Sequence, residues 1–283
     1  MGKSRLVREF RREVAADESV FWCTVNCPST YTPSAYWLVG QILRRLFGLT
    51  PAMSETEAWR YVEEVAQDAM HITRADAGAR EAFSLIGDLL ELKRDGAAMG
   101  MPDVGAQRRK LAKIVRQLLV WRTAIQPVIV VIDNGQWADE ASLELMTAFT
   151  KAAEDLPVLW LVTLPTFAAS PTPWRDQNNY RAIKLRELEE TDSAALLATL
   201  LDSRSLDVQL QQIVLPAARG NPLFLREFVA SLTEAEILQR RDGVWRLTRL
   251  LARRDVPDTI QRVIRLRIEA LSDAAQQVLP VLA

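Results

Sequence analysis

Three residues at the start of the chain have the types and order of a phosphate-binding loop. A complete loop reads G-x-x-x-x-G-K-[ST] and follows a buried strand, and Gly2, Lys3 and Ser4 match its last three positions. In such a loop the lysine is a cation for the β- and γ-phosphates, the hydroxyl binds Mg²⁺, and the glycine allows close backbone approach. The tripeptide alone is weak evidence, because it occurs by chance in many proteins.

A second motif far downstream makes the first one informative. Residues 128–132 read VIVVI, a continuous apolar run typical of a strand buried in a parallel sheet, and Asp133 follows it directly. Ligands bind beyond the carboxyl ends of such strands, where a carboxylate can hold Mg²⁺ or its water. The alternative is an ordinary turn residue at the end of a strand, but the apolar run before it favours the metal-binding role.

The positions after this aspartate carry further chemistry. Asn134 stands where an acid could polarise the attacking water, and because an amide cannot accept the proton we expect slow hydrolysis or none. We expect Trp137 to pack rather than to stack on a base, and Asp139 to cap a helix. The segment 220–222, Gly-Asn-Pro, reads as a corner between two helices, with a ligand-binding role as the alternative.

The elements that must position these residues alternate between helix and strand up to about residue 185, which indicates an α/β sheet with helices on both faces. Apolar runs predict the strands, and apolar positions at helical spacing predict the helices. The predicted strands are 19–26, 128–132, 156–163 and 182–185. The predicted helices are 4–16, 34–47 with Ser34 as the cap, two between 54 and 95, 107–124, and one beginning at Asp139 or Glu140.

Beyond residue 189 the pattern changes to helices with hardly any strands. We predict helices at 190–202, 206–218 and 222–238, one wing strand at 243–247, and further helices starting at Asp258 and Ser272. The predicted domains are therefore 1–188, an α/β domain; 189–238, a helical lid; and 239–283, the start of a winged-helix-like domain. The incomplete loop at the start and the apolar end at 278–283 predict a fragment cut at both ends.

The composition excludes several classes of protein. The 283 residues are 49% hydrophobic and carry a net charge of -1, so no global field attracts nucleic acid or an anionic membrane. No signal peptide and no apolar run of membrane-spanning length occurs, so no membrane contact is expected. Two cysteines cannot form a disulfide framework, which predicts a protein of the reducing cytoplasm. Cys23 and Cys27 read as small residues near the core, and with His71 as the one histidine a Cys/His metal site lacks ligands.

Arginines are concentrated near the end of the chain. On a winged fold they could contact DNA, but acidic residues stand among them, and we prefer solvated helix faces or a polar domain interface. The cluster comprises Arg240, Arg241, Arg246, Arg249, Arg253, Arg254, Arg262, Arg265 and Arg267.

These pieces in this order resemble the ATPase module of the STAND class of AAA-related P-loop NTPases, as found in large bacterial regulators. Residues 2–10 look like the end of the Walker A motif and its helix, and residues 128–139 are similar to the Walker B segment with its Gln-Trp-Ala-Asp ending. Residues 220–224 resemble the Gly-Asn-Pro signature of the lid, and 256–271 look like the winged-helix segment. The resemblance thus covers nearly the whole chain.

The resemblance implies a P-loop NTPase parallel sheet with flanking helices, here without its first strand, followed by a lid and a winged helix. It implies that ATP or ADP with Mg²⁺ is bound by Gly2, Lys3, Ser4 and Asp133, with Ser4 and Asp133 on the metal, and that Pro222 lies near the adenine. The family usually has a second acid at Asn134, commonly Asp-Leu at 134–135, and often an arginine where Leu164-Pro165 stand. These departures weaken the expectation of hydrolysis more than that of binding.

The predicted function is an ATP/ADP-binding regulatory switch with weak or no hydrolysis, within a multidomain signal-transduction or transcription regulator. Its expected partners are the nucleotide and other domains of the parent chain, of the cyclase, helix-turn-helix or tetratricopeptide type, with self-association left open and direct DNA contact disfavoured. One alternative is a degenerate scaffold that no longer binds nucleotide. Another is a DNA-binding module that uses the arginine cluster.

Overall fold

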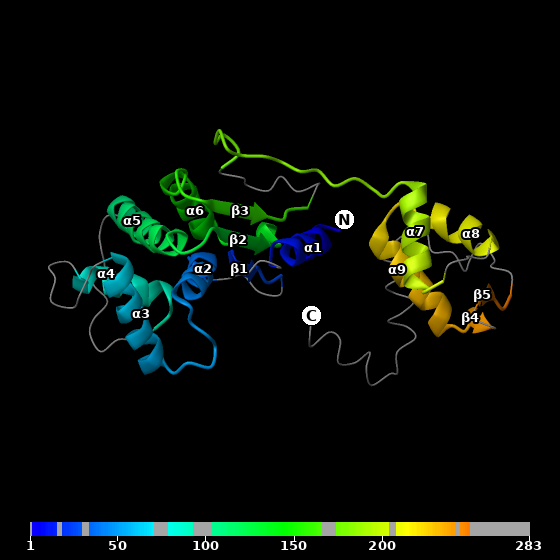
Figure 1. Ribbon diagram of the computed structural model, residues 1–283, viewed down its shortest axis with the longest axis horizontal. Coiled ribbons are helices and arrows are strands. Elements are labelled where there is room, and N and C mark those ends of the chain that lie inside the picture. Colours follow the sequence, from blue (N-terminus) through cyan, green and yellow to red (C-terminus); the bar gives the residue numbers. More distant parts are fainter. Residues whose placement is uncertain are drawn as a thin grey trace. The chain divides into compact units, whose positions relative to one another are not determined.

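The computed structural model describes residues 2–15, 19–29, 34–70, 79–92, 104–165, 174–203, 208–241 and 244–249. The chain forms two compact units. We call Leu6–Ala182 the sheet unit, and Ile183–Ala283 together with Met1–Arg5 the helical unit. Figure 1 labels the helices and strands of both units.

The sheet unit is built on three parallel strands. They are β1 (Phe21–Asn26), β2 (Val128–Asp133) and β3 (Val158–Val162), in the order β1-β2-β3. The strands predicted at 19–26, 128–132 and 156–163 are therefore confirmed. The apolar run of β2 lies in the centre and is buried up to Ile132, as expected for a strand covered on both faces. Because the strands are parallel and aligned, their carboxyl ends meet at one edge of the sheet.

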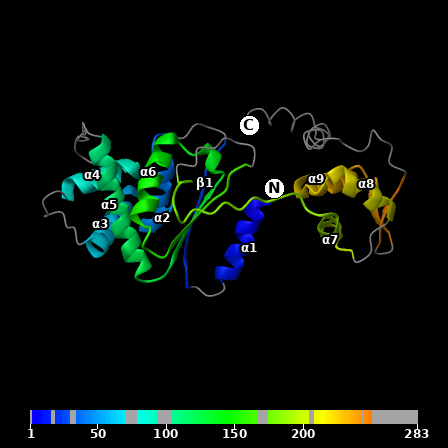
Figure 2. The same ribbon diagram turned by 90° about the horizontal axis from the view of Figure 1, so that it is seen from above.

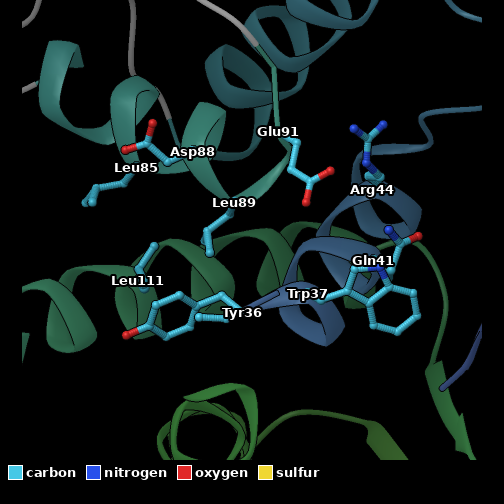
Figure 3. A pocket seen from close by; sticks show the side chains of 10 residues that line it. Tyr36, Trp37, Gln41, Arg44, Leu85, Asp88, Leu89, Glu91 and Leu111 are labelled. Carbon is cyan, nitrogen blue, oxygen red and sulfur yellow. The ribbon is translucent and has the colours of Figure 1, made fainter. Parts of the chain in front are cut away.

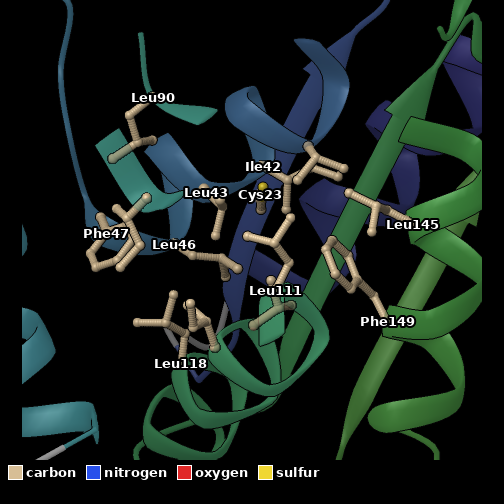
Figure 4. Close-up of a cluster of buried hydrophobic side chains, with 14 of the residues drawn as sticks. Cys23, Ile42, Leu43, Leu46, Phe47, Leu90, Leu111, Leu118, Leu145 and Phe149 are labelled. Atoms are coloured by element: carbon tan, nitrogen blue, oxygen red, sulfur yellow. The ribbon is translucent and has the colours of Figure 1, made fainter. Parts of the chain in front are cut away.

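Helices cover both faces of this sheet (Figures 1 and 2). On one face α2, α5 and α6 enclose the main core, shown in Figure 4, and α3 and α4 pack outside them. On the other face α1 meets β1, where the rings of Phe10 and Trp22 lie 5.7 Å apart. The helix bounds are α1 Lys3–Ala15, α2 Trp37–Phe47, α3 Glu55–Met70, α4 Ala79–Leu89, α5 Val104–Thr123 and α6 Glu140–Ala152, with a 3₁₀ turn η1 at Gly135–Trp137.

The start of α2 corrects one prediction. We expected Ser34 to cap a helix over 34–47, but α2 begins at Trp37, and Tyr36 is its N-terminal flanking residue in the left-handed region with φ 66°. Ser34 contributes only its backbone oxygen, which accepts from the Trp37 N–H at 3.1 Å, while its hydroxyl donates to Glu91 at 3.4 Å. The side-chain caps of α2 come instead from a segment more than a hundred positions away.

A second correction concerns residues 182–185, which form no strand. Ile183 is 79% exposed, so the short apolar run there is not covered by a sheet. Its position at the boundary between the two compact units explains the exposure, because the chain there passes from one core to the other.

The helical unit contains α7 (Glu190–Leu200), α8 (Val208–Ala218) and α9 (Pro222–Glu234), followed by the antiparallel strands β4 (Leu238–Arg241) and β5 (Val244–Leu247). Its core is separate from that of the sheet unit. The three helices and the strand at 243–247 confirm the predictions, but the last helix ends at Glu234, and β4 follows where helix was expected. The Trp245 indole N–H donates to the Leu201 carbonyl at 2.6 Å and fixes β5 to the end of α7.

Among the helices that the structure describes, none has the length and apolar character needed to cross a bilayer.

Candidate functional site

The carboxyl edge of the sheet brings polar side chains from all three strands together. Asp133 ends β2, Asn26 ends β1 and pairs with it in register, and Thr163 directly follows β3. Asp133 is half-buried, and the Thr163 hydroxyl donates a hydrogen bond to its carboxylate. This contact fixes one oxygen of the carboxylate.

Asn134 completes the cluster through an unusual backbone conformation. It lies in the left-handed region, with φ 57° and ψ 43°, which asparagine tolerates better than most residues. Its N–H donates to the Thr163 hydroxyl at 2.9 Å and to Asp133 at 3.2 Å, and its side-chain amide donates to the Asn26 Oδ1 at 2.9 Å. The amide assignment follows from this hydrogen-bond network. The Asn134 side chain is thus held across the ends of β1 and β2.

Thr163 is a member of the site that sequence reasoning missed. The family resemblance points only to the two positions after the strand at 156–163, where this chain has Leu164 and Pro165 instead of an arginine. The signal was available, because a hydroxyl stands directly after an apolar strand in the same way that Asp133 follows its own. What the sequence did not reveal is that these two strands are neighbours.

Gly135 fixes the turn that follows this cluster. It is buried, and its N–H donates to the Thr163 carbonyl at 2.9 Å. A Cβ at this position would lie 2.7 Å from a methyl group of Val162 and 3.2 Å from Leu164. The turn therefore packs directly on β3 and leaves no space for a larger residue.

Trp137 differs from its prediction. We expected it to pack, but it is 47% exposed. The reason is the tight geometry of η1, which turns Gly135 inward and leaves the indole of Trp137 partly in solvent.

Asp139 caps a helix, as predicted, and also a second one. Its Oδ1 accepts from the Ser142 N–H of α6 at 2.8 Å and from the Tyr36 N–H at 2.8 Å, and its Oδ2 accepts from the Leu38 N–H at 3.2 Å. Ser142 adds a hydroxyl that accepts from the Val39 N–H at 3.2 Å. The amino end of α2 is therefore satisfied by the amino end of α6.

The two cysteines are buried thiols, in agreement with the prediction. Burial raises the pKa of Cys23 to about 12. Burial, together with the carboxylates of Asp139 and Asp133, raises the pKa of Cys27 to about 11. A protonated thiol is a weak nucleophile, so both side chains fit the role of small core residues.

The amino-terminal motif lies at the start of α1. Gly2 has φ 89° and open space around its Cα, and α1 begins at Lys3, so Ser4 lies in its first turn. The N-terminus of a helix presents N–H groups suited to a phosphate. Residues up to Arg5 group with the helical unit, and the meeting of Lys3 with Asp133 stays a prediction.

The Gly-Asn-Pro segment forms the predicted helix corner. Gly220 has φ 69°, and its carbonyl accepts from the Leu188 N–H at 2.8 Å. The Asn221 side chain accepts from two N–H groups of α9 at 3.0 and 3.2 Å, and Pro222 opens that helix. Helix capping accounts for this pattern, and the adenine contact of Pro222 stays a prediction.

A pocket of about 90 Å³ lies between the start of α2 and the end of α4 (Figure 3). Its lining includes Tyr36, Trp37, Arg44, Asp88 and Glu91, and none of the predicted site residues. The pocket is therefore not the predicted nucleotide site, although Tyr36 belongs both to its wall and to the contacts of Asp139.

Other predicted features lie outside the described residues. They are His71, the winged-helix segment 256–271 and the arginines from Arg253 to Arg267. Arg240, Arg241 and Arg246 lie on β4 and β5. DNA binding, the disfavoured alternative, stays untested.

A parallel α/β sheet with an acidic residue at the end of its central strand has the architecture of nucleotide-binding α/β domains. Residues 1–161 match the AAA ATPase domain family, and the chain belongs to this family. Membership implies binding of ATP, and it supports the P-loop interpretation. Residues 189–246 match a domain of unknown function, DUF8739.

One curated relative is "Uncharacterized protein R02095" of Rhizobium meliloti (strain 1021), 24% identical over 234 residues that cover 80% of this chain and 21% of the relative. The chain thus spans about a fifth of the length of that relative. No solved structure matches the chain.

The donor set at the sheet edge fits a magnesium ion. Mg²⁺ binds through one or two protein oxygens and retains waters and phosphate oxygens as its other ligands. Asp133 offers such a carboxylate at the end of β2, and the hydroxyl contribution of Ser4 stays a prediction. When bound, the ion would neutralise phosphate charge, while Thr163 holds the carboxylate in one orientation.

Proposed function

We propose that the chain is a regulatory switch module that binds ATP or ADP with Mg²⁺ and hydrolyses ATP slowly or not at all. The single observation that carries the proposal is the cluster at the end of β2, where Asp133 is held by the Thr163 hydroxyl beside the left-handed Asn134. Lys3 and Ser4 would contact the phosphates and the metal, and Pro222 the adenine.

Slow turnover follows from the chemistry of Asn134. Its amide nitrogen donates to Asn26, so the side chain is engaged across the sheet edge, and an amide has no basic site for the proton of an attacking water. Binding needs only the phosphate contacts and the metal. A module of this kind responds to which nucleotide is bound instead of cycling rapidly.

The proposed output is a change in the position of the lid, which is passed to other domains of a larger protein. We expect the lid to respond to the nucleotide and to pass the change to attached cyclase, helix-turn-helix or tetratricopeptide domains, or to a second copy of the chain. The small share of its curated relative that the chain covers supports such a multidomain setting.

The test is a titration with ATP and ADP, with and without Mg²⁺, by calorimetry on the chain and on the longest natural protein that contains it. Lys3→Ala and Asp133→Asn should each weaken magnesium-nucleotide binding by about tenfold or more, because each removes a charged contact worth about 1.4 kcal/mol or more. Asp88→Asn, which removes an exposed carboxylate on α4, is the matched control and should bind normally.

Three results would contradict the proposal. Absence of binding in the longest protein would favour the scaffold alternative. Binding that is insensitive to both substitutions would place the nucleotide elsewhere. Salt-dependent DNA binding without nucleotide binding would instead favour the arginine cluster as the functional surface.

A further inference from the structure

We propose that Asp139 is a positioning residue that couples the site at the end of β2 to the start of α2. This inference rests on the proposed function only where it predicts how the first turn of α2 responds to bound nucleotide. The mechanical coupling itself is a property of the chain without nucleotide and can be tested without it.

The first step is the rigidity of the segment between Asp133 and Asp139. Four N–H groups in it are hydrogen-bonded. Asn134 donates to the Thr163 hydroxyl and Gly135 to the Thr163 carbonyl, while Trp137 donates to the Asn134 carbonyl at 3.0 Å and Ala138 to the Gly135 carbonyl at 3.2 Å. The buried Gly135 anchors the turn against β3. A displacement of Asn134 is therefore carried along the segment to its end.

The second step is the position of the Asp139 carboxylate between two helix ends. It accepts N–H groups from α6 and from α2 at once, and a carboxylate at two helix N-termini is favoured by both helix dipoles. Tyr36 is held in the left-handed region at this contact. A tyrosine there is strained, and such a conformation persists only when its surroundings fix it.

The third step is that the connection from β1 to α2 is held at both ends by the same segment. At its start the Cys27 N–H donates to the Asp133 carbonyl at 2.9 Å, and at its end the Tyr36 N–H donates to Asp139. The ends of β1 and β2 and the starts of α2 and α6 thus form one connected body. Tyr36 also lines the pocket between α2 and α4, so the coupling reaches a second surface of the sheet unit.

The sharpest variant is Asp139→Ser. Serine is as good an N-cap as aspartate, so the cap of α6 is retained, but its shorter side chain cannot also reach the N–H groups of Tyr36 and Leu38. Asp139→Asn is the matched control, because its Oδ1 can still accept from Ser142 and Tyr36, the two contacts at 2.8 Å. Its amide nitrogen cannot accept from the Leu38 N–H, so this background is compared at the Val39 amide, which donates to Ser142.

The coupling is measured by hydrogen exchange of the first turn of α2 in the nucleotide-free chain. Thr163→Val perturbs the other end of the segment, and we expect it to speed exchange of the Leu38 and Val39 amides by about fivefold, the effect of losing one cap. In the Asp139→Ser background the α2 amides already exchange fast, and adding Thr163→Val should change them by less than about twofold. In the Asp139→Asn background most of the Thr163→Val effect should remain.

Two results would overturn the inference: no effect of Thr163→Val on the α2 amides, or equal and independent effects in all three backgrounds. If the inference holds and the proposed function is also correct, Mg-ATP should protect the same amides in the natural protein and not in the Asp139→Ser variant. Coupling without any nucleotide binding would support the role of Asp139 and refute only the proposed function.

Discussion

The replacement Gly220→Ala gives a test in which the structure itself sets the magnitude. Gly220 has φ 69°, and an alanine Cβ there would lie 2.3 Å from the Leu188 carbonyl oxygen and 2.9 Å from the Glu187 Cβ. These are main-chain or main-chain-adjacent atoms that cannot rotate away. The left-handed conformation costs alanine about 1–2 kcal/mol, and forced overpacking adds about 1–3 kcal/mol, for about 2–5 kcal/mol in the free energy of unfolding.

Gly48→Ala is the matched control. Gly48 follows α2 with φ 79°, but its nearest neighbours are the side chains of Tyr61 at 3.5 Å and Arg122 at 3.7 Å, so an added methyl group fits. This variant should lose only the conformational part, about 1–2 kcal/mol. The difference between the losses in unfolding free energy of the two variants therefore measures the cost of the clash with Leu188.

The two units can be followed separately during urea denaturation. Cys23 and Cys27 are the two cysteines of the chain and both lie in the sheet unit, so the rate of thiol labelling reports that unit, whereas circular dichroism reports all helices. Gly220→Ala should shift a circular-dichroism transition to lower urea by about 1 M or more and leave thiol labelling unchanged. Gly48→Ala should shift thiol labelling. The reasoning is refuted if Gly220→Ala lowers the free energy of unfolding by no more than Gly48→Ala does.

Three further predictions concern the sheet edge and the thiols. Thr163→Val should lower the free energy of unfolding by about 1–3 kcal/mol, because the half-buried Asn134 N–H loses an acceptor and Asp133 a donor; urea denaturation checks this, and Thr163→Ser should be near wild type. Asn134→Asp should raise ATP hydrolysis in a phosphate-release assay, because it supplies the missing acid, whereas Asn134→Ala should not; equal rates in both variants would remove the role assigned to this position. The unfolding free energy should fall as pH rises above about 9, because the unfolded thiols ionise there while folded Cys23 and Cys27 stay protonated up to about 12 and 11; denaturation at pH 8 and 10 measures the fall, and a Cys23→Ala/Cys27→Ala variant that keeps the same slope would exclude these thiols as its cause.

The strand β2 and its terminal aspartate were predictable because the signal is local. Five consecutive apolar residues and a following carboxylate indicate a buried strand with an acidic residue at its end, whatever the rest of the chain does. The same is true of the corner at 220–222, where glycine and proline punctuate two helices. These features need no knowledge of tertiary contacts.

Other features were not predictable because their cause lies far away in the sequence. The start of α2 is decided by Asp139 and Ser142, which no local pattern around residue 36 reveals. Thr163 belongs to the site only because β3 lies beside β2. The strand β4 carries polar residues, Gln239, Arg240 and Arg241, so neither apolar periodicity nor strand propensity marked it.

The half-exposed indole of Trp137 is an intrinsic fluorescence probe. The 3₁₀ turn places this residue close in sequence to the cluster at the sheet edge, so an event that alters the local solvent or charge should change its emission or its quenching by acrylamide. Subtracting the spectrum of a Trp137→Phe variant would isolate this signal from the other seven tryptophans, without attaching any dye.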